Sequence, residues 1–232
     1  MALHSDGRIL GERNFAHGLQ NAALILPLLD ELCQEHGLKA RDIDNVAVSI
    51  GPGSFTGLRI GVTLAKSLCF ATGAKLIAVP TMPVIALNAP AGAGNIMPIL
   101  DAKRDQVFAA VYRQTVSGVL DEILAPRLIH LPDMLALAER PLLVIGEGIT
   151  YHAQHLFTGD APELANRTPK FAAIAIAPAD LWIPRATTVA SVAVRLMQQG
   201  AYADPFTLTP LYIRKPEAQE RMEAGLLKHL EI

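Results

Sequence analysis

Apolar positions in the first 80 residues follow two different spacings. Apolar side chains that recur with a helical period predict helices over residues 22–35 and 58–71, the second of which ends at Gly73. Short continuous apolar runs predict buried strands at residues 46–50 and 75–79. Because helices and strands alternate along this part of the chain, we expect a sheet covered by helices, an α/β fold class.

The pattern changes from Ile96 onward, where the apolar runs become shorter and more frequent. They predict strands in the segments IMPIL, QVFAAVY, EILAPRLI, LLVIG and AAIAI. Helical spacing predicts two more helices, at residues 133–139 and 188–199, and Gly200 ends the second one. This part of the chain is therefore expected to form a second sheet.

Residues 88–95, NAPAGAGN, separate the two patterns. The segment is rich in Gly, Ala and Pro, which is typical of a hinge. We therefore predict an N-terminal lobe at residues 1–95 and a C-terminal lobe with its tail at residues 96–232. A chain of 232 residues with 51% apolar side chains can bury a sizeable core in this arrangement.

Composition and charge limit the classes of function. With 18% charged residues and a formal net charge of -2, the chain has no basic footprint for binding nucleic acid unaided, so a role on RNA would need a partner. The N-terminal residues lack a basic segment followed by an apolar one, and the apolar runs are too short to span a bilayer. Cys33 and Cys69 have no metal-type spacing and are expected to be free, buried thiols. We expect a cytoplasmic protein.

The segment GPGSFTGLR joins a predicted strand to a predicted helix. In this strand-to-helix turn, Gly51 ends the strand, Pro52 fixes the turn and Gly53 lets the backbone pass close to a neighbour. Ser54 or Thr56 can cap the new helix. Free backbone N–H groups at such a helix start favour an anion, so a phosphate loop and a simple tight turn are both open at this point.

Two specific nucleotide-binding signatures fail in this turn. A Walker A loop has four residues between its glycines and then Lys followed by Ser or Thr, whereas Gly51 and Gly57 are separated by five residues and Leu58 follows. The dinucleotide fingerprint fails because the glycines have the spacing GxGxxxG. The spacing therefore disfavours a phosphate cradle.

Small residues recur every four positions along the helix that follows the turn. This stripe allows another backbone to approach closely, either the sheet of the same lobe or a helix of another subunit. The stripe consists of Gly57, Gly61, Ala65, Cys69 and Gly73.

Arg59 lies in the first turn of the same helix. A cation there opposes the helix dipole, so we expect a compensating partner. That partner is either a carboxylate or phosphate on another molecule, or Asp42 or Asp44 of the same lobe.

The helix predicted at residues 22–35 has apolar side chains on nearly every side. Leu24, Leu28 and Leu32 share one face, and Ile25 and Leu29 occupy the adjacent one. Such a helix is buried on two sides. One side can face the sheet, and the other suggests a subunit interface.

Five blocks of the sequence resemble those of the bacterial TsaB (YeaZ) family. The blocks are GPGSFTGLRIG, AVPT, ILDAKRDQVFAAVY, GEG and LYIRKPEA, in family order across nearly the whole chain. The resemblance implies a two-lobed actin-like ATPase and sugar kinase (ASKHA) fold. It also implies a non-catalytic subunit that pairs with a catalytic TsaD-type subunit and works with a TsaE-type ATPase. Together they form threonylcarbamoyladenosine at adenosine 37 of tRNAs that read ANN codons.

Further expectations follow from this resemblance. The tRNA is reached only through the complex, ATP and metal belong to the partner subunits, and the chain forms a homodimer when alone. The helices at residues 19–35 and 57–72 would form the partner interface. Its residues would be Leu24, Leu28, Leu32, Gly57, Arg59, Gly61 and Ala65. No catalytic, cofactor-binding or metal-binding residue is predicted in the chain.

The alternative is a stand-alone ATPase, sugar kinase or metallopeptidase. A resembling catalytic subunit carries an HxxxH metal pair after the strand that corresponds to LIAV, and this chain has PTMPVIALNA there. The pair His152 and His155 has a spacing that can chelate a metal, but we interpret it as a solvated helix face. Asp101 ends an apolar strand, and we interpret it as the turn residue of a hairpin, DAKRD.

The start of the chain departs from the family pattern. Family members begin with a strand that carries an Asp-Thr pair, whereas MALHSDGRIL matches only the second strand and its turn. Either this form lacks the first strand or the start has been assigned too late. We favour the second interpretation, because losing a central strand would expose the edges of its two neighbours.

Overall fold

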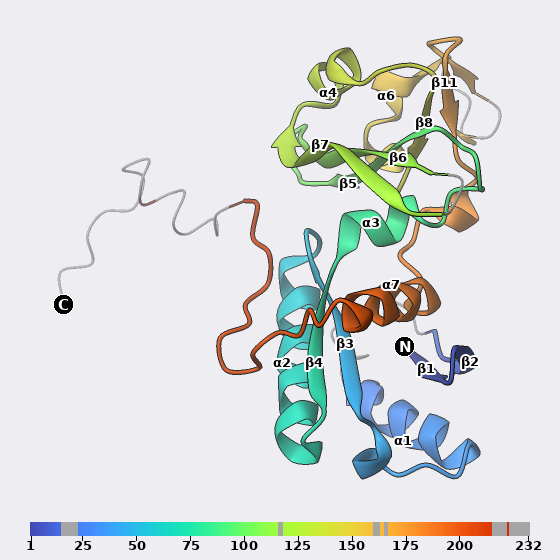
Figure 1. Ribbon diagram of the computed structural model, residues 1–232. Coiled ribbons are helices and arrows are strands. Elements are labelled where there is room, and N and C mark those ends of the chain that lie inside the picture. Colours follow the sequence, from blue (N-terminus) through green and yellow to red (C-terminus); the bar gives the residue numbers. More distant parts are fainter. Residues whose placement is uncertain (15–22, 116–117, 160–162, 165–166, 215–221, 223–232) are drawn as a thin grey trace.

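The computed structural model describes residues 1–14, 23–115, 118–159, 163–164, 167–214 and 222, and these form a mixed α/β protein (Figure 1). The predicted fold class is thus confirmed. The start of the helix expected at residues 22–35, and that of the block 19–35, lies outside the described residues. The part that is described, α1, spans Ile25–Glu35.

The N-terminal part contains two separate pairs of strands. β1 (Ala2–Ser5) and β2 (Arg8–Glu12) form an antiparallel hairpin. β3 (Asn45–Gly51) and β4 (Lys75–Pro80) are parallel, and α2 (Phe55–Thr72) connects them. The predicted strands and the predicted helix between them are confirmed, and Gly73 ends α2 with the expected left-handed backbone, at φ 80°.

The larger sheet has five strands in the order β11-β8-β5-β6-β7. β5 is central, parallel to β8 and antiparallel to β6. All five strands that the apolar runs predict are present: β5 (Asn95–Asp101), β6 (Val107–Gln114), β7 (Leu120–Ile129), β8 (Leu142–Ile145) and β11 (Ile174–Ile176).

Alternating side chains of the β5–β6 hairpin face two different apolar clusters. Met97 and Ile99 belong to the cluster on one face of the sheet, whereas Ile96 and Leu100 belong to the cluster on the other. Since both faces are covered, these strands are apolar almost throughout, as for a sheet with no solvated side.

Short helices cover the first face of this sheet. They are α4 (Leu131–Leu137), α5 (Gly148–Tyr151) and α6 (Ala153–Leu156). A small pair of strands, β9 (Phe157–Thr158) and β10 (Thr168–Pro169), follows them. α4 begins two residues before the predicted helix, because Pro132 fits the first turn, where no backbone N–H is needed.

Two helices pack across the predicted boundary between the lobes. α3 (Thr81–Ala86) contributes Met82 and Ile85 to the second face of the five-stranded sheet. α7 (Ala186–Gln198) lies beside β3 and β4 in Figure 1, and its residue Ala193 shares a cluster with Ile77 and Val79 of β4. The division at residues 95 and 96 stays a prediction, and these contacts tie the two parts together.

Two glycines allow α5 to lie directly against the backbone of β5. A Cβ atom on Gly146, which has φ 117°, would lie 2.2 Å from the carbonyl oxygen of Ile99. A Cβ atom on Gly148 would lie 3.1 Å from the same oxygen. The glycines of the GEG motif are therefore required by a close approach of backbone to backbone.

We predict that Gly146→Ala lowers the free energy of unfolding by about 3 kcal/mol, because it adds a clash to an unfavourable backbone conformation. Denaturant unfolding measures the change. Gly200→Ala is the matched control, since Gly200 also has positive φ but open space around its Cβ position. We expect the control to cost only about 1 kcal/mol. Equal losses in the two variants would contradict the close approach.

Candidate partner-binding surface

The glycine turn before α2 is filled by the chain itself. A Cβ atom on Gly51, at φ 114°, would lie 2.9 Å from Leu58 Cδ1 and 3.0 Å from the carbonyl oxygen of Leu211. The N–H group of Gly51 donates to Thr81 Oγ1 at 3.1 Å, and the N–H group of Leu211 donates to the Ile50 carbonyl at 2.7 Å. The required glycine thus accommodates a later segment of the same chain.

The start of α2 is capped by its own sequence. Ser54 Oγ accepts a hydrogen bond from the N–H group of Gly57 at 3.3 Å, so Ser54 and not Thr56 is the cap. Pro52 is buried in the turn. A Cβ atom on Gly53 would meet nothing within 4 Å, so the close neighbour predicted at Gly53 is instead found at Gly51.

Arg59 has aromatic partners. Its guanidinium carbon lies 3.9 Å from the centre of the Phe55 ring, and its Nε donates to Tyr212 Oη at 3.1 Å. The Phe55 and Tyr212 rings themselves are 4.9 Å apart. Of the two alternatives for Arg59, the ion pair with Asp42 or Asp44 is not formed among the described residues, where a cation-π contact and a hydroxyl take its place. A carboxylate or phosphate on another molecule stays a prediction.

Much of the small-residue stripe of α2 packs against the protein's own sheet. A Cβ atom on Gly61 would lie 3.6 Å from Val48 of β3, and Ala65 and Cys69 are buried in the cluster that contains Leu76. Of the two alternatives that the sequence left open, the described contacts favour packing on the sheet. Gly57, by contrast, is exposed.

Two residues predicted for the partner interface are buried within this chain. Ala65 is 4% exposed and Leu32 is fully buried. Leu32 packs so closely on Gly11 that a Cβ atom on Gly11 would clash with it. Neither can contact a partner in this conformation, and this corrects the prediction. The apolar period found the helix faces but did not distinguish internal packing from an interface.

Two exposed apolar side chains lie at the start of α1. Leu24 is 48% exposed and Leu26 is 52% exposed, while Leu28 is half-buried. Phe55 at the start of α2 is also exposed. We call Leu24 and Leu26 the exposed apolar group. The sequence analysis did not single out Leu26, which lies off the Leu24–Leu28 face.

Both cysteines are free and buried, as the sequence predicts. Burial raises the pKa of the thiols of Cys33 and Cys69. Buried thiols of this kind pack as small apolar groups and are chemically inert.

The two histidines of YHAQH do not form a solvated helix face. His152 is 2% exposed, because it lies at the junction between α5 and α6 with φ -119° and turns inward. Its Nε2 lies 3.3 Å from Asp101 Oδ1. The structure therefore corrects the interpretation of His152, and it joins His152 to Asp101, a pair that sequence spacing could not connect.

Asp101 begins the β5–β6 hairpin as predicted, with its Oδ1 accepting from the N–H group of Lys103 at 3.0 Å. Its Oδ2 lies 2.7 Å from Lys103 Nζ. Burial of the carboxylate raises its pKa, but the hydrogen bonds from Lys103 and His152 and the charge of Lys103 outweigh this effect. The net result is a pKa of Asp101 below its ordinary value, which keeps the group ionised.

In the part of the chain that the structure describes, the helices are too short or too polar to cross a membrane.

The comparisons with known proteins cover most of the chain. A family model described as TsaD, tRNA N6-adenosine threonylcarbamoyltransferase, matches residues 20–222. The tRNA threonylcarbamoyladenosine biosynthesis protein TsaB of Escherichia coli K12 is 24% identical over 229 residues, 96% of this chain and 92% of that protein. TsaB of Bacillus subtilis is 35% identical over 132 residues, 56% of this chain. That alignment spans only 57% of the Bacillus subtilis protein.

Solved structures match the fold. One is described as an uncharacterized protein from Pseudomonas aeruginosa with similarity to peptidase YEAZ. It has a TM-score of 0.75 and 24% identity, with coverage of 92% of this chain and 93% of that one. YeaZ from the same organism gives a TM-score of 0.70 at 23% identity, covering 91% and 92%. The predicted actin-like ASKHA fold is confirmed. Since the family model matches most of its length, the chain belongs to the tRNA N6-adenosine threonylcarbamoyltransferase family and, within it, to the TsaB (YeaZ) group.

Proposed function

We propose that this protein is a non-catalytic subunit that binds and activates a TsaD-type catalytic subunit in the formation of threonylcarbamoyladenosine on tRNA. The exposed apolar group carries this proposal. Leu24 and Leu26 each leave about half of their side chain in water, at the start of a helix. Covering such side chains with a partner removes apolar surface from water, which favours association.

The glycine turn supports the same role. A phosphate loop presents its backbone N–H groups to a ligand, but here Gly51 donates to Thr81 and Gly57 donates to Ser54. Leu211 also contacts the turn. The turn therefore holds the C-terminal segment in place and orients α2, which favours a scaffold over a stand-alone ATPase.

The remaining parts of the proposal follow from the family. The protein acts in the cytoplasm on adenosine 37 of tRNAs that read ANN codons, it reaches the tRNA only through the complex, and a TsaE-type ATPase takes part. ATP and any metal that serves the transfer reaction belong to the partner subunits. In the absence of a partner, two copies pair through the same exposed apolar group.

We predict that Leu26→Asp weakens the complex with the TsaD-type subunit at least tenfold, since it places a charge in an apolar contact. Sedimentation velocity over a range of concentrations measures the dissociation constant. Leu137→Asp is the matched control. Leu137 lies at the end of α4, and its exposed fraction of 55% is similar to the 52% of Leu26. This control should bind like the unmodified chain. The proposal fails if the unmodified chain forms no mixed complex, or if the two variants bind equally well.

We also predict that the purified chain alone hydrolyses ATP no faster than a buffer blank, while its addition stimulates threonylcarbamoyl transfer by the partner subunits. Release of phosphate and incorporation of labelled threonine into tRNA provide the two measurements. Leu26→Asp should reduce the stimulation in proportion to its weaker binding. Turnover by the isolated chain on the scale of ordinary enzymes, about 1 s⁻¹ or faster, would favour the stand-alone enzyme.

A further inference from the structure

A cluster of histidine and acidic side chains lies where the β5–β6 hairpin meets α5 and α6. The close approach at Gly146 and Gly148 brings α5 against β5, and the chain then turns inward at His152. His155 follows on α6, and Asp105 projects from the hairpin turn. One potential ligand atom from each of Asp105, His152 and His155 lies within 4.8 Å of the other two.

The hydrogen bond between His152 and Asp101 determines which ring nitrogen of His152 can bind a metal. Nε2 lies 3.3 Å from Asp101 Oδ1, and the other oxygen of this carboxylate lies 2.7 Å from Lys103 Nζ. A carboxylate only accepts, so Nε2 carries the proton and donates it. Nδ1 of His152 is then left with its lone pair, directed toward the rest of the cluster. A carboxylate behind the ring in this way is the usual support of a metal-binding histidine.

One ring nitrogen of each histidine lies near the same carboxylate oxygen. His152 Nδ1 lies 3.8 Å from Asp105 Oδ1, and His155 Nε2 lies 3.5 Å from the same oxygen. Both nitrogens are buried, and neither finds a hydrogen-bond partner within the described residues. His152 is itself 2% exposed. Buried ring nitrogens that have no hydrogen-bond partner are costly, and a metal ion bound between them and the carboxylate would satisfy them.

The distances suit a tetrahedral metal ion. Bonds of about 2.0–2.2 Å to nitrogen and oxygen place neighbouring ligand atoms roughly 3.4 Å apart around a tetrahedral centre. The two distances to Asp105 Oδ1 are close to this value, and the third distance, between His152 Nδ1 and His155 Nε2, is at most 4.8 Å. The Asp105 carbonyl also contacts His130 Nδ1 at 2.9 Å, which holds the hairpin turn in position.

We propose that His152 Nδ1, His155 Nε2 and Asp105 Oδ1 bind a divalent transition-metal ion, with Zn²⁺ the best match. Two imidazoles and one carboxylate suit zinc, cobalt or nickel, whereas Mg²⁺ and Ca²⁺ prefer oxygen ligands alone. Asp101 supports His152 from behind. Three protein ligands leave a fourth position for water or for a group on another molecule.

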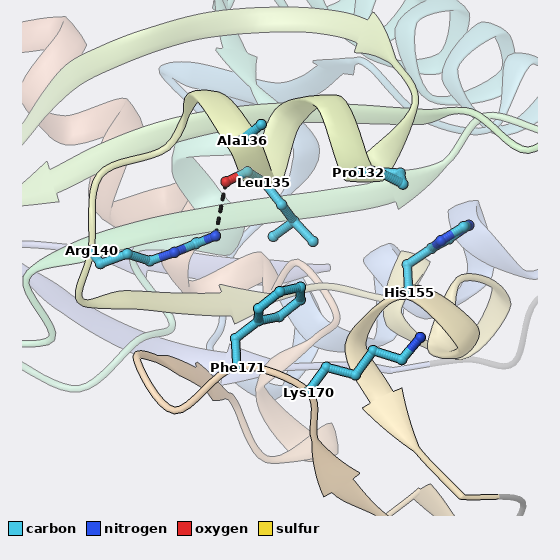
Figure 2. Close-up of a pocket in the computed structure, with 7 residues that line it drawn as sticks. All are labelled: Pro132, Leu135, Ala136, Arg140, His155, Lys170 and Phe171. Carbon is cyan, nitrogen blue, oxygen red and sulfur yellow. Dashed lines mark hydrogen bonds between the residues drawn. The ribbon is translucent and has the colours of Figure 1, made fainter.

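The site borders solvent through Asp105 and His155. The Asp105 side chain is 60% exposed, and His155 also lines an open hollow of about 360 Å³. Figure 2 shows His155 at the same end of this hollow as Pro132 and Lys170, far from Arg140.

Titration of the tag-free, full-length protein with ZnCl2 after removal of metal tests the site. Isothermal calorimetry should give one Zn²⁺ per chain with a dissociation constant in the micromolar range or below. Co²⁺ should produce the visible absorption of a tetrahedral complex. An excess of Mg²⁺ should not displace the ion. Absence of saturable Zn²⁺ binding, or displacement by Mg²⁺, overturns the proposal.

Variants locate the ion. His155→Ala and Asp105→Asn should each weaken Zn²⁺ binding at least tenfold, and both residues are accessible enough for the variants to fold, as circular dichroism will verify. His36→Ala is the control, since His36 is exposed at the end of α1 and outside the cluster, and it should bind Zn²⁺ like the parent. Unchanged affinity in both cluster variants overturns the assignment.

The role of Asp101 has a separate spectroscopic test. A long-range ¹H–¹⁵N spectrum of the metal-free protein should show His152 protonated at Nε2 alone, with Nδ1 shifting on addition of Zn²⁺. A proton on Nδ1 in the metal-free protein that stays there after Zn²⁺ is added would overturn the ligand assignment.

Discussion

The β5–β6 hairpin is buried on both faces, and this constraint organises the rest of the molecule. Ile99 faces one apolar cluster and Leu100 the other, so each face needs its own cover. α4, α5 and α6 cover the first face, and α3 reaches over from the end of β4 to cover the second. Because α3 continues directly from β4, packing α3 on the second cluster also joins the two parts of the protein.

The spacing of apolar residues predicted most of the fold. Burial of one face makes every second residue of a strand apolar, and every third or fourth residue of a helix. β3, β4, the strands of the five-stranded sheet and the helices α1, α2 and α7 follow from these patterns, and Gly73 marks the end of α2 by local chemistry. The spacing of apolar residues could not show what covers each apolar face. Leu32 and Ala65 have the pattern of contact residues, but their partners are other parts of the same chain.

Polar side chains were harder to place because their partners are distant in sequence. Arg59 lies 153 residues from Tyr212, and His152 lies 51 residues from Asp101. Local rules identified Arg59 as needing a partner but favoured a carboxylate, since an aromatic partner leaves no trace in charge pattern. For His152 the i, i+3 spacing suggested one continuous helix, whereas two short helices meet at this residue and turn it inward.

The positions of the two candidate surfaces bear on how they can act. Figure 1 shows α1, with the exposed leucines, at one end of the molecule and α6, with His155, at the other, with α3 between them. α3 connects the two ends and is packed on both sides: Met82 and Ile85 contact the five-stranded sheet, and Val84 belongs to the cluster of β4 and α7. A densely packed element shifts as a unit rather than deforming gradually. An ion at His152 and His155 therefore has two possible effects on the far surface: none, or a displacement of α3 as a whole.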